Sequence, residues 1–235
     1  MPKTTIRLIR HASGTHMGDA GVIAGRSPSA QLTREGRSQA HVRGLSWQCE
    51  GYQPDFIESS PILRCRMTAE IALRAAGLSA LPVTMRDELA EMCQGALEGQ
   101  PRTAEIQAQM DKQRGSFRAP GVNEEGLPGE NFGDGTARCL AYLQSHAQAS
   151  ANSEQDRQVL AFSHRVLLGT GLSYLALRRE IGPEGVSADD VRDRYMGTRT
   201  SVPIPPCSET SITVWPGDTV DAFQFDINYI GRTEY

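Results

Sequence analysis

The chain alternates short runs of apolar and β-branched residues with stretches of helical periodicity, and this alternation most limits the folds open to it. Runs of this kind occupy residues 4–9, 55–60, 82–85 and 159–162. Strands that alternate with helices form parallel sheets whose two faces are both covered, so such strands are apolar throughout. The pattern therefore predicts an α/β fold, a three-layer α/β/α sandwich around a mainly parallel central sheet.

Capping residues and prolines indicate where the helices begin. Thr33 is placed to cap a helix that runs to about Cys49. Pro61 suits the first turn of the next helix, to about Ala76, because its missing N–H is not needed there. Two more helices are expected over residues 132–148 and 166–179, and a hairpin-like pair of strands over residues 212–215 and 223–227.

Composition excludes several classes of protein and ligand. The 235 residues are 39% hydrophobic and 22% charged, as in one large globular domain rather than a disordered or fibrous chain. A net charge of −4 gives no general attraction to nucleic acid or to anionic membranes. No apolar run approaches the ~20 residues that span a bilayer, and the N-terminus lacks a signal-peptide pattern. The five cysteines include no C-x-x-C pair. We therefore expect a single domain over residues 1–235 in the cytoplasm, without a disulfide framework, metal or cofactor.

Between residues 100 and 130 the periodicity weakens. Prolines and glycines interrupt one short helical stretch near residues 103–113. Irregular segments of this length often lie over a site, so a lid or insertion is predicted at about residues 100–130. The basic residues of this segment favour an anionic substrate, although a solvated charged face would have the same composition; they are Arg102, Lys112, Arg114 and Arg118.

Three of the predicted strands lead into residues that can bind or attack a phosphoryl group. Arg10 and His11 end the first strand, Arg64 follows the second by one turn, and His164 ends the strand near residue 160. Ligands in α/β sheets lie at the carboxyl ends of strands, which would bring these side chains together. A neutral imidazole can attack phosphorus, and guanidinium groups bind phosphate oxygens. A leaving alkoxide also needs a proton from a carboxyl group.

The order of these motifs resembles the histidine phosphatase superfamily, the phosphoglycerate-mutase-like enzymes known for an R-H-G signature. The R-H pair is followed by L-T-x-x-G-x-x-Q-A at residues 32–40, S-S-P-x-x-R at 59–64, L-x-E-x-x-x-G at 89–95 and S-H at 163–164. The resemblance spans residues 6 to about 170 and is loose beyond. Each motif alone is weak, but their joint order at predicted strand ends is specific.

The resemblance implies a catalytic role for five residues. His11 would be the phosphorylated nucleophile, and Arg10, Arg64 and His164 would form the phosphate pocket around it. Glu91 occupies the family's proton-donor position, so it is the candidate general acid and, after phosphoryl transfer, the base that activates water. The family uses no metal.

Three departures from the family pattern lie near this pocket. Ala12 replaces the glycine that usually follows the nucleophile, a change that only a positive φ would oppose. The phosphate-binding Asn is missing beyond it, so Ser13 or Thr15 is the candidate for that contact. Arg165 replaces the glycine after the second histidine and points either into the site, as a further anion contact, or out to solvent. Glu130, in a G-E-N segment that resembles the family's G-E-S, is a further candidate substrate contact.

Three functions compete. The leading one is hydrolysis of a small phosphomonoester, with a small phosphorylated molecule and neither nucleic acid nor a membrane as the partner. A cofactor-dependent phosphoglycerate-type mutase is the second, disfavoured because the W-N pattern of such mutases is missing after the R-H pair. A non-catalytic phospholigand-binding or scaffold protein is the third, for which residues 12 and 165 are the only hints. A homodimer is compatible with the sequence, but no pattern marks its interface.

Overall fold

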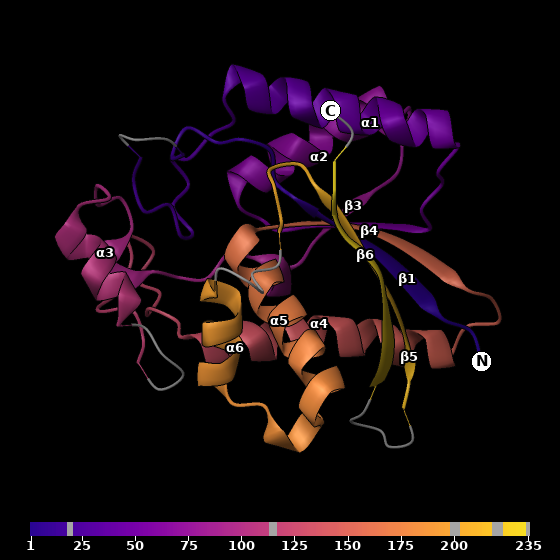
Figure 1. Ribbon diagram of the computed structural model, residues 1–235. Helices are drawn as coiled ribbons and strands as arrows, with labels where there is room; N and C mark the ends of the chain where they lie inside the picture. The colour runs from indigo at the N-terminus through magenta and orange to yellow at the C-terminus, as the bar shows by residue number, and fades with distance from the viewer. Residues whose placement is uncertain (18–20, 113–116, 198–202, 218–222, 234–235) are drawn as a thin grey trace.

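A six-stranded mixed sheet with the order β3-β2-β4-β1-β5-β6 forms the centre of the computed structural model (Figure 1). The structure describes residues 1–17, 21–112, 117–197, 203–217 and 223–233. Four strands are parallel: β1 (Thr4–Arg10), β2 (Phe56–Ser59), β3 (Val83–Met85) and β4 (Arg157–Ser163). At one edge β5 (Glu209–Pro216) pairs antiparallel with β1, and β6 (Phe223–Arg232) antiparallel with β5.

Helices cover both faces of the sheet, which confirms the predicted sandwich. On one face lie α1 (Arg34–Glu50) and α2 (Leu63–Ala75); on the other lie α4 (Phe132–Ala151), α5 (Arg165–Ile181) and α6 (Ala188–Met196) (Figure 1). Beside these layers projects α3 (Ala104–Asp111). Three short 3₁₀ helices, η1 (Asp87–Leu89), η2 (Gly95–Leu97) and η3 (Pro183–Gly185), complete the described elements.

Each central strand divides its side chains between two cores. In β4, Val159 and Ala161 belong to a cluster that contains residues of α4 and α5, whereas Leu160 and Phe162 belong to one that contains residues of α1 and α2. Successive side chains of a strand point to opposite faces, so a strand covered on both sides must be apolar at every position. This is why the buried part of β4, from Val159 to Phe162, contains no polar residue.

Several boundaries differ from the sequence predictions. Thr33 caps α1 as expected, since its Oγ1 accepts a hydrogen bond from Gly36 N at 2.9 Å. The prediction that Pro61 begins α2 is wrong: Ile62 is the N-cap, and its N–H donates to Ser60 Oγ at 3.2 Å, so the chain turns before the helix starts. The helix α6 was not predicted from the sequence, because it is mostly polar and only Val191 of it is buried.

In the part of the chain that the structure describes, no helix combines the length and the apolar character that crossing a membrane requires.

Candidate active site

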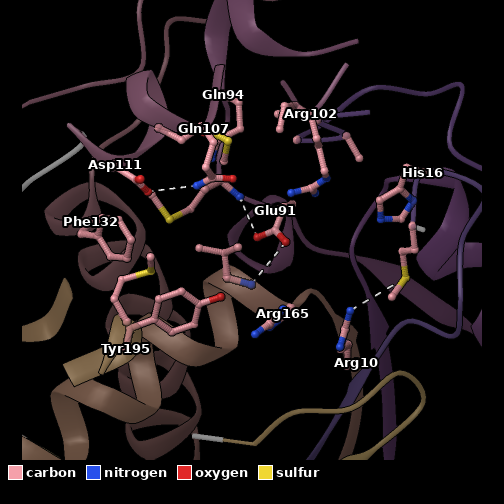
Figure 2. A pocket seen from close by; sticks show the side chains of 18 of the residues that line it. Arg10, His16, Glu91, Gln94, Arg102, Gln107, Asp111, Phe132, Arg165 and Tyr195 are labelled. Atoms are coloured by element: carbon pink, nitrogen blue, oxygen red, sulfur yellow. Dashed lines mark hydrogen bonds between the residues drawn. The ribbon is translucent and has the colours of Figure 1, made fainter. Parts of the chain in front are cut away.

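A cavity of about 600 Å³ lies where β1 ends, and several helices and loops contribute to its wall. The loop after β1, the segment after η1 and the first turn of α5 form one part of the wall. Side chains of α3 and α6 form another, among them Gln107, Asp111, Arg192 and Tyr195 (Figure 2). The predicted lid segment at residues 100–130 thus contributes directly to the cavity.

His11 is buried in this wall as a neutral imidazole with one nitrogen fixed. Its Nδ1 lies 2.7 Å from the Ala12 carbonyl oxygen, which can only accept a hydrogen bond, so Nδ1 carries the proton. Burial, followed by the charges of Arg64 and Arg10, holds the pKa of His11 well below its usual value. The unprotonated Nε2 is therefore the nitrogen available to a ligand in the cavity.

Arg64, on α2, is almost completely buried, with 1% of its surface exposed. Its Nη2 donates to the Gly25 carbonyl at 2.7 Å, but its Nε and Nη1 are buried without a hydrogen-bond partner. Leaving donors of a buried charge unpaired is costly, so this arrangement favours a bound anion. Arg10, also buried, donates from Nη1 to the Ile204 carbonyl at 2.6 Å and lines the same cavity.

His164 lies directly beside His11, with the centres of the two rings 5.2 Å apart. Its Nε2 lies 2.8 Å from Ser60 Oγ and 3.3 Å from Cys65 Sγ, so these two side chains orient the ring. Its Nδ1 is buried without a hydrogen-bond partner. Burial, Arg64 and His11 lower the pKa of His164 well below its usual value, so its imidazole is uncharged at neutral pH. This positioning role of Ser60 was not predicted from the sequence.

Glu91 is held at the cavity by the start of α5. Its Oε1 accepts hydrogen bonds from the backbone N–H groups of Met92 and Leu167, both at 3.0 Å, and its Oε2 from that of Val166 at 3.3 Å. A carboxyl group at a helix N-terminus is stabilised by the unpaired N–H groups there. The structure thus brings the five residues with predicted catalytic roles to one place.

The predicted substrate contacts divide into two groups. Arg165 lines the cavity, so it takes the inward orientation (Figure 2). Ser13, Thr15 and Glu130 are not among the lining residues. Thr15 is exposed and its Oγ1 accepts from Gln31 N at 3.3 Å.

Glu130 is occupied by other partners. Its carboxylate forms ion pairs with Arg26 at 3.2 Å and Arg138 at 3.0 Å, and it accepts from Cys93 N at 2.7 Å. These contacts tie the 91–94 segment to the start of α4, so Glu130 supports the wall of the cavity from behind.

Ala12 is accommodated without strain. Among the described residues other than glycine, Cys207 alone has a positive φ, so the backbone at residue 12 does not require glycine. The Ala12 side chain is fully buried in a small cluster with Leu32 and Ala40.

The basic residues of the lid segment have different surroundings. Arg102 lines the cavity, whereas Arg118 pairs with Asp134 at 2.7 Å. Lys112 is exposed at the end of α3, and Arg114 lies outside the described residues.

Sequence reasoning also missed residues that line the cavity. His16 is one of them, and no motif marked it. Arg192 and Tyr195 belong to α6, which was not predicted because its polar sequence has no apolar pattern of helical period. Across the described ranges, no three His, Cys, Asp or Glu side chains are grouped as a metal site would require.

Comparison with known structures finds the same fold in proteins of low sequence identity. The structure titled Mycobacterial hydrolase 2 has a TM-score of 0.71 and 19% identity, covering 100% of this chain and 93% of that one. Mycobacterial glucosyl-3-phosphoglycerate phosphatase has a TM-score of 0.68 and 18% identity, covering 98% and 100%. Phosphoglycerate mutase from Bacillus anthracis has a TM-score of 0.62 and 15% identity, covering 96% and 92%. No curated protein sequence matches the chain.

A family model settles the classification that the motifs suggest. The model of the histidine phosphatase superfamily (branch 1) matches residues 6–181, which include the R-H pair, the S-S-P-x-x-R segment and His164. The chain belongs to the histidine phosphatase superfamily, branch 1.

Proposed function

We propose that this protein hydrolyses a small phosphomonoester through a covalent phosphohistidine on His11. One observation carries the proposal: a neutral His11, oriented by the Ala12 carbonyl, faces a cavity in which buried N–H groups of Arg64 have no partner within the protein. Donors of this kind bind the equatorial oxygens of a transferring phosphoryl group and need not reorganise during the reaction.

The reaction would take two steps. In the first, Nε2 of His11 attacks phosphorus while the bond between phosphorus and the ester oxygen breaks, and a protonated Glu91 gives its proton to that oxygen. In the second, the Glu91 carboxylate takes a proton from water as the water oxygen attacks phosphorus. The bond between His11 and phosphorus then breaks, and inorganic phosphate leaves with the enzyme restored.

A generic aryl phosphate tests this function. We expect turnover by the wild-type protein in the presence of a chelator, and loss of on the order of 10⁴-fold or more in kcat/KM for His11→Ala. His41→Ala, at an exposed position of α1, is the matched control and should match the wild type. Rapid quenching in base should trap a phosphoenzyme that acid destroys, as expected for phosphohistidine.

Three results would contradict the proposal. Turnover that survives in His11→Ala, or that stops with chelator, excludes the phosphohistidine mechanism. A phosphoenzyme that transfers its group only to a phosphoglycerate acceptor would indicate a mutase instead. Absence of turnover with every phosphomonoester would favour a binding protein.

A further inference from the structure

His16 lines the cavity beside His11, and the mechanism above does not use it. Only 9% of its surface is exposed, and it lies in the cavity wall near Arg10 and Arg102 (Figure 2). The centre of its ring is 5.6 Å from that of His11, close to the 5.2 Å that separates His11 from His164. The rings of His16 and His164 thus both lie within contact distance of the ring of the nucleophile.

The loop after β1 is fixed in a way that holds His16 in this position. Thr15 N donates to the Gln31 carbonyl at 2.8 Å, and Thr33 N donates to the Ser13 carbonyl at 3.0 Å. A Cβ at Gly14 would lie 2.6 Å from Cε1 and Nδ1 of His16, so glycine is what leaves space for the ring. The backbone pairing and the glycine together make the position of the imidazole a specific feature of this loop.

The protonation state of His16 follows from its surroundings. Burial, then the charges of Arg64, Arg102 and Arg10, lower its pKa to about 4, so it is uncharged at neutral pH. Its Nδ1 is buried without a partner, packed where a Gly14 side chain would be. A buried unpaired N–H is rarer than an unpaired acceptor, so the proton belongs on Nε2. His16 therefore offers one neutral N–H donor.

From this geometry we propose that His16 binds the transferring phosphoryl group, donating Nε2–H to one of its non-bridging oxygens. The inference rests on the proposed function and adds a contact to it. The residues expected to supply a donor after the nucleophile do not reach the cavity, since neither Ser13 nor Thr15 lines it. A neutral donor there would bind phosphate oxygens without the strong ground-state attraction of another full charge.

Paired substitutions at this position test the proposal. His16→Gln keeps an N–H donor near the position of Nε2, whereas His16→Leu removes it at similar volume. We expect kcat/KM for aryl phosphate to fall about 30-fold in His16→Leu and less than about 5-fold in His16→Gln. The affinity for inorganic phosphate and for orthovanadate, measured by calorimetry, should fall in His16→Leu and stay close to the wild-type value in His16→Gln. His41→Leu is the matched control.

Two further measurements keep the test decisive. Phosphate binding does not need turnover, so it decides the role of His16 even if the wild type hydrolyses nothing and the proposed function fails. The ¹⁵N spectrum of the unmodified protein should show the Nε2–H tautomer of His16 and a shift of that signal on addition of phosphate, which covers the case in which His16→Leu does not fold. Three results would overturn the proposal. They are an unchanged phosphate affinity in His16→Leu, equal losses of kcat/KM and phosphate affinity in both variants, and a ¹⁵N signal of His16 that does not shift when phosphate is added.

Discussion

Two buried polar clusters of the molecule differ in how their polar atoms are satisfied. In the first, Glu58 accepts a hydrogen bond from the Tyr142 hydroxyl at 2.7 Å and lies 2.9 Å from Nε2 of His146, both on α4. In the second, Arg64 and His164 have buried nitrogens without a hydrogen-bond partner. Both clusters contain a buried histidine, but only the second faces a cavity.

The difference separates groups that stabilise the fold from groups that await a ligand. A buried carboxylate that is fully paired contributes conformational order, and removing it leaves its partners unpaired. A buried guanidinium with unpaired donors costs stability until an anion occupies the site. We therefore expect the unpaired donors of the cavity to lower the stability of the unliganded protein and to bind an anion. The cluster around Glu58 is expected only to stabilise the fold.

Among the substitutions that compare the two clusters, the largest effect is expected at Arg64. Replacing it with Met keeps the volume and removes a buried charge, so we expect kcat/KM for aryl phosphate to fall by about 10³-fold because the phosphate loses its main donor. The free energy of unfolding should stay level or rise by about 1 kcal/mol, since no unpaired charge remains buried. Urea denaturation and steady-state kinetics measure the two effects. A variant that loses stability along with activity would show that Arg64 is a structural residue.

The opposite result is expected for Glu58. In Glu58→Leu the hydroxyl of Tyr142 and the imidazole of His146 are left buried without their acceptor, so the free energy of unfolding should fall by about 3 kcal/mol. The kcat/KM of the folded variant should remain within about 3-fold of the wild type, because the cluster does not line the cavity. Glu70→Leu, at an exposed carboxylate on α2, is the control and should change stability little. Equal loss of activity and stability in Glu58→Leu would remove the distinction between the clusters.

Sequence alone predicted one of these clusters and not the other, for a physical reason. Arg10 is the last residue of one parallel strand, and His164 and Arg64 follow the ends of two others. Parallel strands bring their carboxyl ends to one edge of the sheet, so local patterns sufficed. The pairing of Glu58 with His146 joins a strand to a helix 88 residues later, and neither position carries a local mark. Such contacts are set by packing, which sequence periodicity does not encode.

The same reasoning explains what was missed at the cavity. The helix α6 buries a single residue, so it has no apolar stripe from which to predict it. The position of His16 depends on the backbone pairing of Thr15 with Gln31 and on the space beside Gly14, and sequence periodicity encodes neither. The prediction of a single domain over residues 1–235 stays a prediction, as does that of a homodimer.

The smallest predicted effect separates the clusters by pH. The cavity histidines have folded-state pKa values below the ordinary value of about 6.5, so as the pH falls below that value the unfolded chain takes up protons that the folded chain does not. Unfolding is then favoured by acid, and the free energy of unfolding should decrease between pH 7 and pH 5. For Glu58, burial opposes ionisation, but hydrogen bonds from His146 and Tyr142 outweigh it and lower its pKa. The contribution of ionised Glu58 to the free energy of unfolding is therefore complete above about pH 4.5 and is lost only as the pH falls below that value.

His16→Gln measures this difference, because it removes one group that resists protonation down to about pH 4. Between pH 7 and pH 5 the variant should lose about 1 kcal/mol less of its free energy of unfolding than the wild type does. Urea denaturation at three pH values in this range gives the slope, and His41→Gln provides the baseline for a solvent-exposed histidine. Equal slopes for all three proteins would mean that His16 is protonated as readily in the folded chain as in the unfolded one. The cavity would then tolerate a further positive charge, and the neutral N–H assigned to His16 would be wrong.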